Sequence, residues 1–170
     1  MNLKKIATYT ILGVAALSAA TLALPRHVSV ERVAMLDTAP ESVLALAASN
    51  EGYQAFTPYL PTDLNVQIDL FGPETGIGSG FHFDGVDGTG SLTVADVTTE
   101  QVTFAIDLGP LGQPTQTISA MPEGEGVQVT WRMEADMGFN PVFRVMGLFM
   151  DGMMGPTFEL GLENLRQAAA

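Results

Sequence analysis

The feature that most constrains the fold is a regular alternation of apolar and polar residues through the middle of the chain. Between residues 64 and 135, successive short runs place an apolar side chain at every second position. In the last run, Val127, Val129, Trp131 and Met133 alternate with polar residues. A period of two predicts β-strands with one apolar and one polar face, so we expect an antiparallel sheet with one buried side.

Turns that contain glycine or proline separate these runs, and a valine-rich run precedes them. Together they predict a sheet of about seven strands, because each run has the length and composition of a strand. The expected strands cover residues 27–36, 64–70, 77–83, 91–97, 102–108, 116–121 and 127–135.

Two short helices are expected between the first strand and the rest. Thr38 and Glu41 have the spacing of a capping box, in which Thr38 caps a helix over residues 42–48. A second helical turn is expected over residues 50–56. The apolar face of the sheet needs a cover.

The C-terminal region supplies this cover with a helix. Asn140 and Pro141 are typical of a helix start, and the apolar residues 142–150 give the helix a face that can cover the sheet. Gly152 and the pair Gly155-Pro156 predict a break or kink before the helix continues. A strongly curved sheet wrapped around one long C-terminal helix is the simplest packing for this order of elements.

The N-terminus carries a separate apolar segment. Residues 6–24 are 19 consecutive uncharged, mostly apolar positions. As a helix they would span about 28 Å, close to the hydrocarbon thickness of a bilayer. The length favours an uncleaved single-pass anchor, and a signal peptide cut after residues 18–20 is the alternative. Lys4 and Lys5 favour a domain on the extracytoplasmic side, although arginines beyond the run weaken that bias.

The composition narrows the possible partners of the domain expected at residues 26–170, which follows the N-terminal segment at 1–25. After Pro25 the chain has five arginines, no lysine and all 19 acidic residues, a formal charge of −14. Such a surface repels phosphate backbones, so we expect no nucleic-acid partner. The absence of cysteine excludes disulfides and thiolate ligands, and two histidines offer little for a zinc site. We therefore expect no metal and no cofactor.

Four stretches of the sequence resemble a known family. They are LPRHVSVER at 24–32, APESV at 39–43, GPETGIGS at 72–79, and MGLFMD with GPTFELGL at 146–162. In this order they resemble the START-like helix-grip proteins of the SRPBCC or polyketide cyclase/dehydrase-like family. The likeness is greatest to its bacterial branch with an N-terminal hydrophobic segment.

The resemblance implies an α+β helix-grip fold with a cavity between the curved sheet and the C-terminal helix. Relatives bind lipids, sterols, polyketides or other apolar molecules in this cavity, and only some of them catalyse a reaction. The family usually has tryptophans where this chain has Tyr53, Phe56 and Phe83. This difference implies a pocket of different shape.

Candidate ligand-binding residues follow from strand parity and from the methionines near the C-terminal helix. Thioethers are flexible and polarisable, which suits a cavity for apolar ligands. Arg144 stands on an otherwise apolar helix and could receive a carboxylate or phosphate, with an ordinary surface arginine as the alternative. Each apolar candidate could equally be plain core. The candidates are Phe81, Phe83, Phe104, Ile106, Trp131, Met133, Arg144, Met146 and Met150.

Three functions remain open on the sequence alone. The first is a membrane-anchored binding protein for an apolar small molecule or lipid. The second is a cyclase or dehydratase that uses the same cavity, for which His82 and Asp84 are the weak catalytic candidates because a histidine with a nearby carboxylate can transfer protons. A solvent-facing pair is the simpler interpretation of these two residues. The third is a non-catalytic module of the cell envelope that binds a partner protein.

Overall fold

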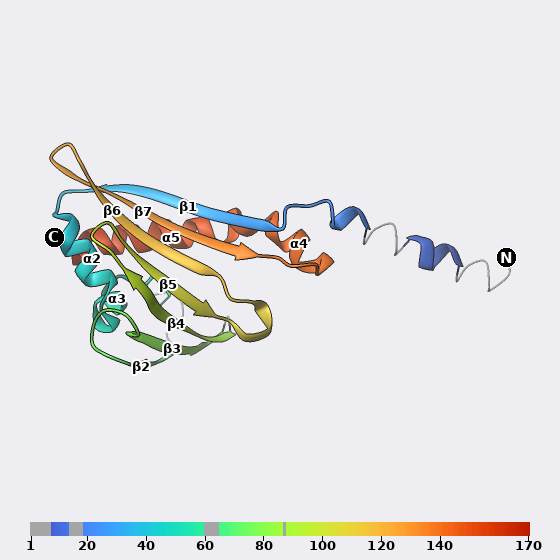
Figure 1. The fold of residues 1–170 in the computed structure, drawn as a ribbon, viewed down its shortest axis with the longest axis horizontal. Helices are drawn as coiled ribbons and strands as arrows, with labels where there is room; N and C mark the ends of the chain where they lie inside the picture. Colours follow the sequence, from blue (N-terminus) through green and yellow to red (C-terminus); the bar gives the residue numbers. More distant parts are fainter. Residues whose placement is uncertain (1–7, 14–18, 60–64, 87) are drawn as a thin grey trace.

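The computed structural model describes residues 8–13, 19–59, 65–86 and 88–170 (Figure 1). Within these ranges, seven strands form one antiparallel sheet in the order β1-β7-β6-β5-β4-β3-β2. The predicted α+β fold, with its seven-stranded sheet and long C-terminal helix, is confirmed. The strands are β1 (His27–Leu36), β2 (Gln67–Phe71), β3 (Gly80–Gly85), β4 (Gly88–Val97), β5 (Gln101–Asp107), β6 (Thr115–Glu123) and β7 (Gly126–Asp136).

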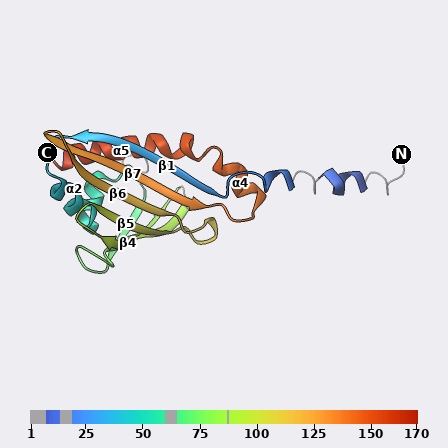
Figure 2. The ribbon, with the colours of Figure 1, turned by 45° about the horizontal axis from the view of Figure 1, so that its top comes forward.

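The helices lie on the concave side of the curved sheet. Helix α5 runs along β1 and β7, whereas α2 packs against β5 and β6, and α3 lies between α5 and β2 (Figures 1 and 2). The long helix therefore covers one edge of the sheet, and the opposite edge, formed by β2 to β4, curves away from it. The helices are α2 (Pro40–Ala47), α3 (Asn50–Phe56), α4 (Pro141–Gly147) and α5 (Met150–Ala168), with a short 3₁₀ turn η1 at Gly109–Leu111.

The predicted alternation sets which side chains form the core. On β7, Val127, Val129, Trp131 and Met133 are buried, and the residues between them are less so. Neighbouring strands keep the same parity because the register places Gln116 opposite Met133. The apolar set of each strand therefore faces the helices, and burial of this surface supplies the main stabilisation of the fold at about 25 cal/mol per Å².

The predicted break in the C-terminal helix is misplaced. The chain breaks between α4 and α5 at Leu148-Phe149, and α5 continues through Gly152, Gly155 and Pro156. Two glycines of α5 have a packing role instead. A Cβ at Gly155 would lie 1.9 Å from the Arg32 guanidinium, and one at Gly161 would lie 2.3 Å from the Trp131 ring. Both glycines thus let the helix approach side chains of the sheet closely.

Two other local predictions differ from the structure. Ala39, not Thr38, is the N-cap of α2, and the Thr38 hydroxyl donates to the Ala169 carbonyl at 2.9 Å. The capping-box prediction is therefore wrong, because this hydroxyl bonds to the end of α5. Strand β3 begins at Gly80 and not at residue 77, since Gly76 and Gly78 have positive φ angles in the preceding turn.

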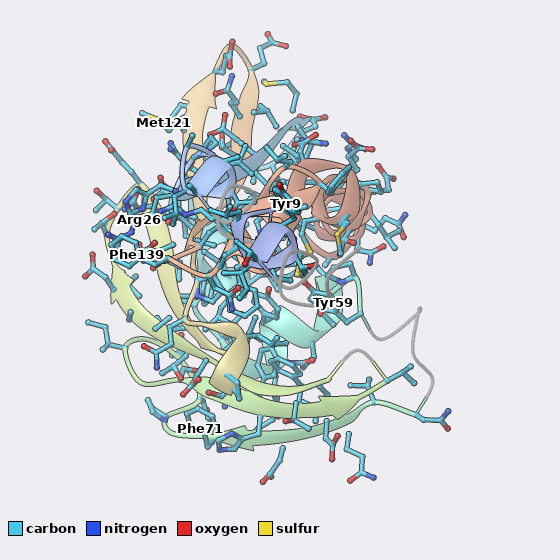
Figure 3. The ribbon with its side chains drawn as sticks, turned by 90° about the vertical axis from the view of Figure 1, so that its right-hand side faces the viewer. Tyr9, Arg26, Tyr59, Phe71, Met121 and Phe139 are labelled. Carbon is cyan, nitrogen blue, oxygen red and sulfur yellow. The ribbon has the colours of Figure 1, made fainter. Side chains whose placement is uncertain are left out.

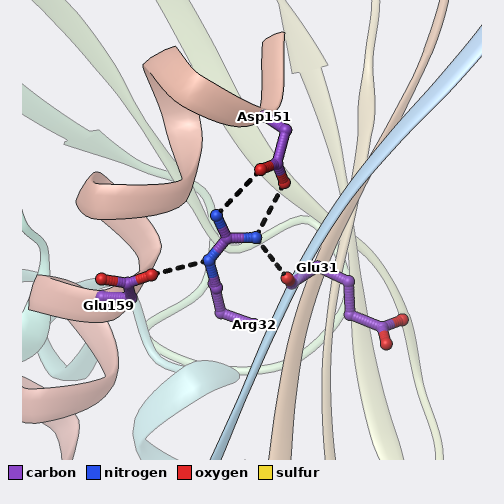
Figure 4. A network of polar contacts seen from close by, with 4 residues as sticks. All are labelled: Glu31, Arg32, Asp151 and Glu159. Atoms are coloured by element: carbon purple, nitrogen blue, oxygen red, sulfur yellow. Dashed lines mark hydrogen bonds and ion pairs between the residues drawn. The ribbon is translucent and has the colours of Figure 1, made fainter.

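An ion-pair network joins the first strand to the last helix. Arg32 of β1 donates to Asp151 at 2.8 Å and to Glu159 at 2.8 Å (Figure 4). It also donates to the Glu31 carbonyl. The Arg32 side chain is about three-quarters buried beside Gly155, so one guanidinium orders two turns of α5 against the edge of the sheet.

The N-terminal segment is described only in part. No helix in the described ranges is long and apolar enough to span a bilayer. Residues 1–7 and 14–18, which include part of the apolar run 6–24, lie outside the described residues. The alternative between an anchor and a signal peptide therefore stays a prediction.

Candidate ligand-binding cavity

A cavity of about 200 Å³ lies between α3 and the strands β2 to β5. Apolar side chains form most of its wall. Helix α5 also contributes to the wall, through Met154. The described wall residues are Tyr53, Thr57, Tyr59, Val66, Ile68, Phe81, Phe83, Gly85, Gly88, Leu92, Ile106, Leu108, Pro114, Gln116, Met133 and Met154.

One buried polar pair interrupts this apolar wall. The Gln116 amide nitrogen donates to the Tyr53 hydroxyl at 2.9 Å, and the two residues are 2% and 1% exposed. Burial raises the pKa of Tyr53 far above its usual value, so its phenol stays protonated at any physiological pH. The Tyr53 hydroxyl can still donate its proton, and the Gln116 amide oxygen can still accept a hydrogen bond. No partner for either is found among the described residues.

The fold positions Tyr53 through the junction of α2 and α3. Ser49 caps α3 by accepting from the Gly52 amide at 3.1 Å, and it forms a bridge with Thr75 in the turn before β3. The Ala48 carbonyl accepts from the Gly76 amide at 2.9 Å. These bonds fix α3 above the sheet, so Tyr53 points toward the middle strands.

The half of the interior beneath α5 is filled by aromatic rings. Trp131 stacks on Phe158 at 5.3 Å between ring centroids, and Phe56 meets its ring edge-on at 5.7 Å. Tyr53 separates this cluster from the cavity, with its ring 5.4 Å from Phe104 and 6.2 Å from Trp131. The space beneath the Phe158 region of α5 is therefore occupied, and the open space lies on the other side of Tyr53, where Met154 is the α5 residue among its described wall residues.

Four of the nine predicted ligand-binding residues lie in the cavity wall, namely Phe81, Phe83, Ile106 and Met133. Three others do not. Phe104 and Trp131 are fully buried in the aromatic core, and Met150 packs against that core from α5. Strand parity placed Phe104 and Trp131 on the correct face, but it could not show that Tyr53 and Phe158 cover them.

The two predicted residues on α4 also lie away from the cavity. Met146 is exposed to solvent. Arg144 is buried, and its guanidinium donates to the backbone carbonyls of Gly138 at 2.7 Å, Leu22 at 3.2 Å and Leu24. The three bonds come from Nε and Nη1, so Arg144 holds the N-terminal segment against α4, and it is not among the cavity wall residues.

His82 and Asp84 lie on the convex face of the sheet. Both are exposed, because they have the opposite parity to Phe81 and Phe83. The His82 ring packs on Phe71 at 4.6 Å, and Figure 3 shows Phe71 on the outer side of the sheet. This position excludes the pair as an acid and base acting inside the cavity.

The polar pair is the feature that the candidate set missed. On β6, Gln116 points to the same side of the sheet as the buried Ile118 and Ala120. A glutamine at such an apolar position of an alternating strand is the sequence feature that could have identified it as a site residue. The family resemblance indicates that the residue at position 53 affects the shape of the pocket. The bond from Gln116 to Tyr53, however, joins residues 63 positions apart. No local pattern predicts such a contact.

A comparison with models of protein families shows to which family the chain belongs. Residues 27–170 match the family described as polyketide cyclase/dehydrase and lipid transport. The chain belongs to this family. The resemblance inferred from its four sequence stretches is thus confirmed, whereas no curated protein sequence matches the chain significantly.

Solved structures in the same fold are similar over most of the domain. Truncated norcoclaurine synthase from Thalictrum flavum superposes with a TM-score of 0.65 at 13% identity, covering 83% of this chain and 92% of that one. Protein BH1534 from Bacillus halodurans gives 0.59 at 17% identity, covering 84% and 96%. One comparison involves the di-domain ARO/CYC StfQ of steffimycin biosynthesis, with a TM-score of 0.60, 14% identity, and 84% and 50% coverage. At these identities the likeness shows the fold.

Proposed function

We propose that this family member binds a compact, mainly apolar molecule that carries one hydroxyl or carbonyl group. The observation that supports this most directly is the cavity of about 200 Å³, whose apolar wall contains the buried Tyr53–Gln116 pair. An apolar ligand would gain about 25 cal/mol for each Å² that it removes from water. Its single polar group would bond to the pair and fix its orientation.

The volume limits the size of the ligand. An apolar cavity of roughly 150 Å³ is large enough to bind benzene, whereas sites for drug-sized molecules start at about 300 Å³. A cavity of about 200 Å³ therefore suits one substituted ring or a short branched chain. A sterol or a complete lipid would require the wall to open.

The wall favours binding over proton-transfer chemistry. Among its described residues there is no His, Asp, Glu, Lys or Arg, and burial keeps the Tyr53 phenol protonated. General acid–base catalysis needs a group that titrates near the working pH. Norcoclaurine synthase has been solved with dopamine and hydroxybenzaldehyde, so a related fold holds substituted single rings. That similarity supports the ligand class proposed for this chain.

We also propose that residues 6–24 anchor the domain to a bilayer. Their 19 uncharged positions have the length of a membrane span, whereas the acidic domain itself should be repelled by an anionic surface. The anchor would then hold the domain at the membrane, on its extracytoplasmic side. A partner-binding module of the envelope remains the alternative, and it requires no ligand in the cavity.

The binding proposal can be tested by mass spectrometry and thermal unfolding of the purified full-length protein. Native spectra should contain a small bound molecule, or the melting temperature should rise with the logarithm of the 4-methylphenol concentration above the Kd. The Ile106→Phe variant, whose larger side chain would occupy part of the cavity, controls for partition of the ligand into detergent. Equal responses of the two proteins, or none from either, would contradict ligand binding in the cavity.

A further inference from the structure

A cluster of exposed apolar side chains covers α4 and the start of α5. Its members are between 40% and 72% exposed, although they are large and apolar. Val142, Val145 and Met146 have the spacing of one face of α4, and Phe149 follows in the break before α5. We call this surface the α4 patch, and it comprises Phe139, Val142, Val145, Met146, Leu148, Phe149 and Met153.

The α4 patch adjoins the N-terminal segment. Arg144, on the inner side of α4, binds the carbonyls of Leu22 and Leu24 and so holds the end of the apolar run against this helix. In Figure 1 the described part of that run leads away from the end of the domain that carries α4. Tyr9, Ile11 and Leu12 of the run are themselves more than half exposed. Two exposed apolar surfaces thus lie toward the same end of the molecule.

The charges next to the α4 patch are few, and they are paired. Residues 137–150 contain no acidic residue in a domain with a formal charge of −14. Arg26 pairs with Asp136 at 2.6 Å and lies 5.1 Å from the Phe139 ring centroid, a contact that Figure 3 shows from the N-terminal side. On the other side, Asp151 pairs with Arg32. An acidic domain that must approach anionic lipid needs such a neutral face.

We propose that the α4 patch lies in the interfacial region of the bilayer that holds residues 6–24. This inference depends on the anchor proposed above, because the anchor places α4 at the membrane surface. Exposed aromatic and aliphatic side chains on one helical face are typical of helices that lie in the headgroup region, and Arg26 can extend its guanidinium to the water there.

This orientation has a consequence for the cavity. Gly85, Gly88, Leu108 and Pro114 of its wall belong to the turns at the end of the sheet where β1 begins and β7 ends. With the α4 patch on the bilayer, that end of the sheet faces the lipid. An apolar ligand dissolved in the membrane would then reach the domain from the side that contributes these wall residues.

Single-cysteine labelling can test the inference because the chain has no cysteine of its own. The full-length protein would be reconstituted in vesicles of phosphatidylcholine and phosphatidylglycerol, with an environment-sensitive NBD probe on Val142→Cys or Phe149→Cys. Leu12→Cys reports on the anchor. Met121→Cys, 49% exposed on the hairpin at the opposite end of the domain, is the matched control. Circular dichroism confirms that each variant is folded.

The inference predicts a blue-shifted emission and quenching by brominated lipids for probes at positions 12, 142 and 149, and neither effect at 121. Quenching at position 12 alone would retain the anchor and overturn the inference. No quenching at any position would overturn both. A blue shift at 142 and 149 without lipid quenching would show that a second copy or another protein covers the α4 patch, which also overturns the inference.

Discussion

The Gln116 amide nitrogen and the Tyr53 hydroxyl oxygen lie 2.9 Å apart in the cavity wall, and they join strand β6 to helix α3. The cross-strand register places Gln116 between Phe104 and Met133 on the concave face. A polar side chain at this apolar position is costly unless it is bonded, so Tyr53 and Gln116 depend on each other.

Replacing Tyr53 by Phe should destabilise the protein by about 1–3 kcal/mol, because it leaves a buried amide without a partner. Wild-type protein should bind 4-methylphenol about threefold to tenfold more tightly than toluene, and the variant should lose this preference. Urea unfolding and calorimetric titration measure the two effects. The double variant Tyr53→Phe/Gln116→Leu removes both partners and should recover part of the stability; an additive loss would contradict the coupling.

Enlarging a side chain in the cavity should be tolerated where enlarging one in the core is not. Ile106→Phe places its extra atoms in the open volume, so the free energy of unfolding should change by less than about 1 kcal/mol while ligand binding is lost. Ile118→Phe, at a fully buried position outside the cavity wall, should cost about 1–3 kcal/mol. Similar losses in both variants would mean that the cavity is already filled.

Gly161 and Gly152 offer a matched pair in α5. An added Cβ at Gly161 would lie 2.3 Å from the Trp131 ring, whereas nothing lies within 4 Å of one at Gly152. Gly152→Ala should therefore stabilise the helix by up to about 1 kcal/mol, and Gly161→Ala should destabilise the protein by about 1–3 kcal/mol. Thermal unfolding compares the two. Equal effects would show that α5 does not contact Trp131 as closely as described.

Acid should weaken the contact between the start of β1 and the end of β7. The Arg26 guanidinium, with help from the Gly138 amide, holds the pKa of Asp136 well below its usual range. Because the folded pKa lies below the unfolded one, this stabilisation is present above about pH 4 and is lost as the pH falls toward the folded value.

The Asp136→Asn variant tests this pH dependence. It should be less stable than wild type near neutral pH, and the difference should shrink at about pH 3. Urea unfolding at both values gives the comparison, and added salt should reduce the difference because the pair is exposed. Asp96→Asn, at an exposed aspartate with no ion pair among the described residues, is the control. A constant difference across this pH range would exclude the proposed linkage.

The sequence alone predicts which residues of the sheet are buried, because burial in a strand follows a local period of two. Val127, Val129, Trp131 and Met133 are buried as predicted, and the resemblance to the family supplied the relation of sheet to helix. The position of the cavity was not predictable in this way. It depends on how far α5 extends across the sheet and on Tyr53, which divides the interior.

The role of a residue could not be predicted where it depends on a contact with a residue far away in the sequence. Arg144 resembled a ligand-binding arginine on an apolar helix, but two of its three backbone carbonyl partners are 120 and 122 positions away. Gly155 was predicted to break the helix, because helix propensity contains no information about Arg32 on the facing strand β1. Tertiary packing overrides such local preferences.

The most direct test of the central claim is a crystal structure of the full-length protein grown with 4-bromophenol. The account predicts one anomalous bromine peak among Ile68, Leu92, Ile106 and Met133, with the phenol oxygen within hydrogen-bonding distance of Tyr53 or Gln116. The same crystals of Ile106→Phe should lack the peak. An empty cavity in the wild-type protein, or bromine bound only on the α4 patch, would contradict the account.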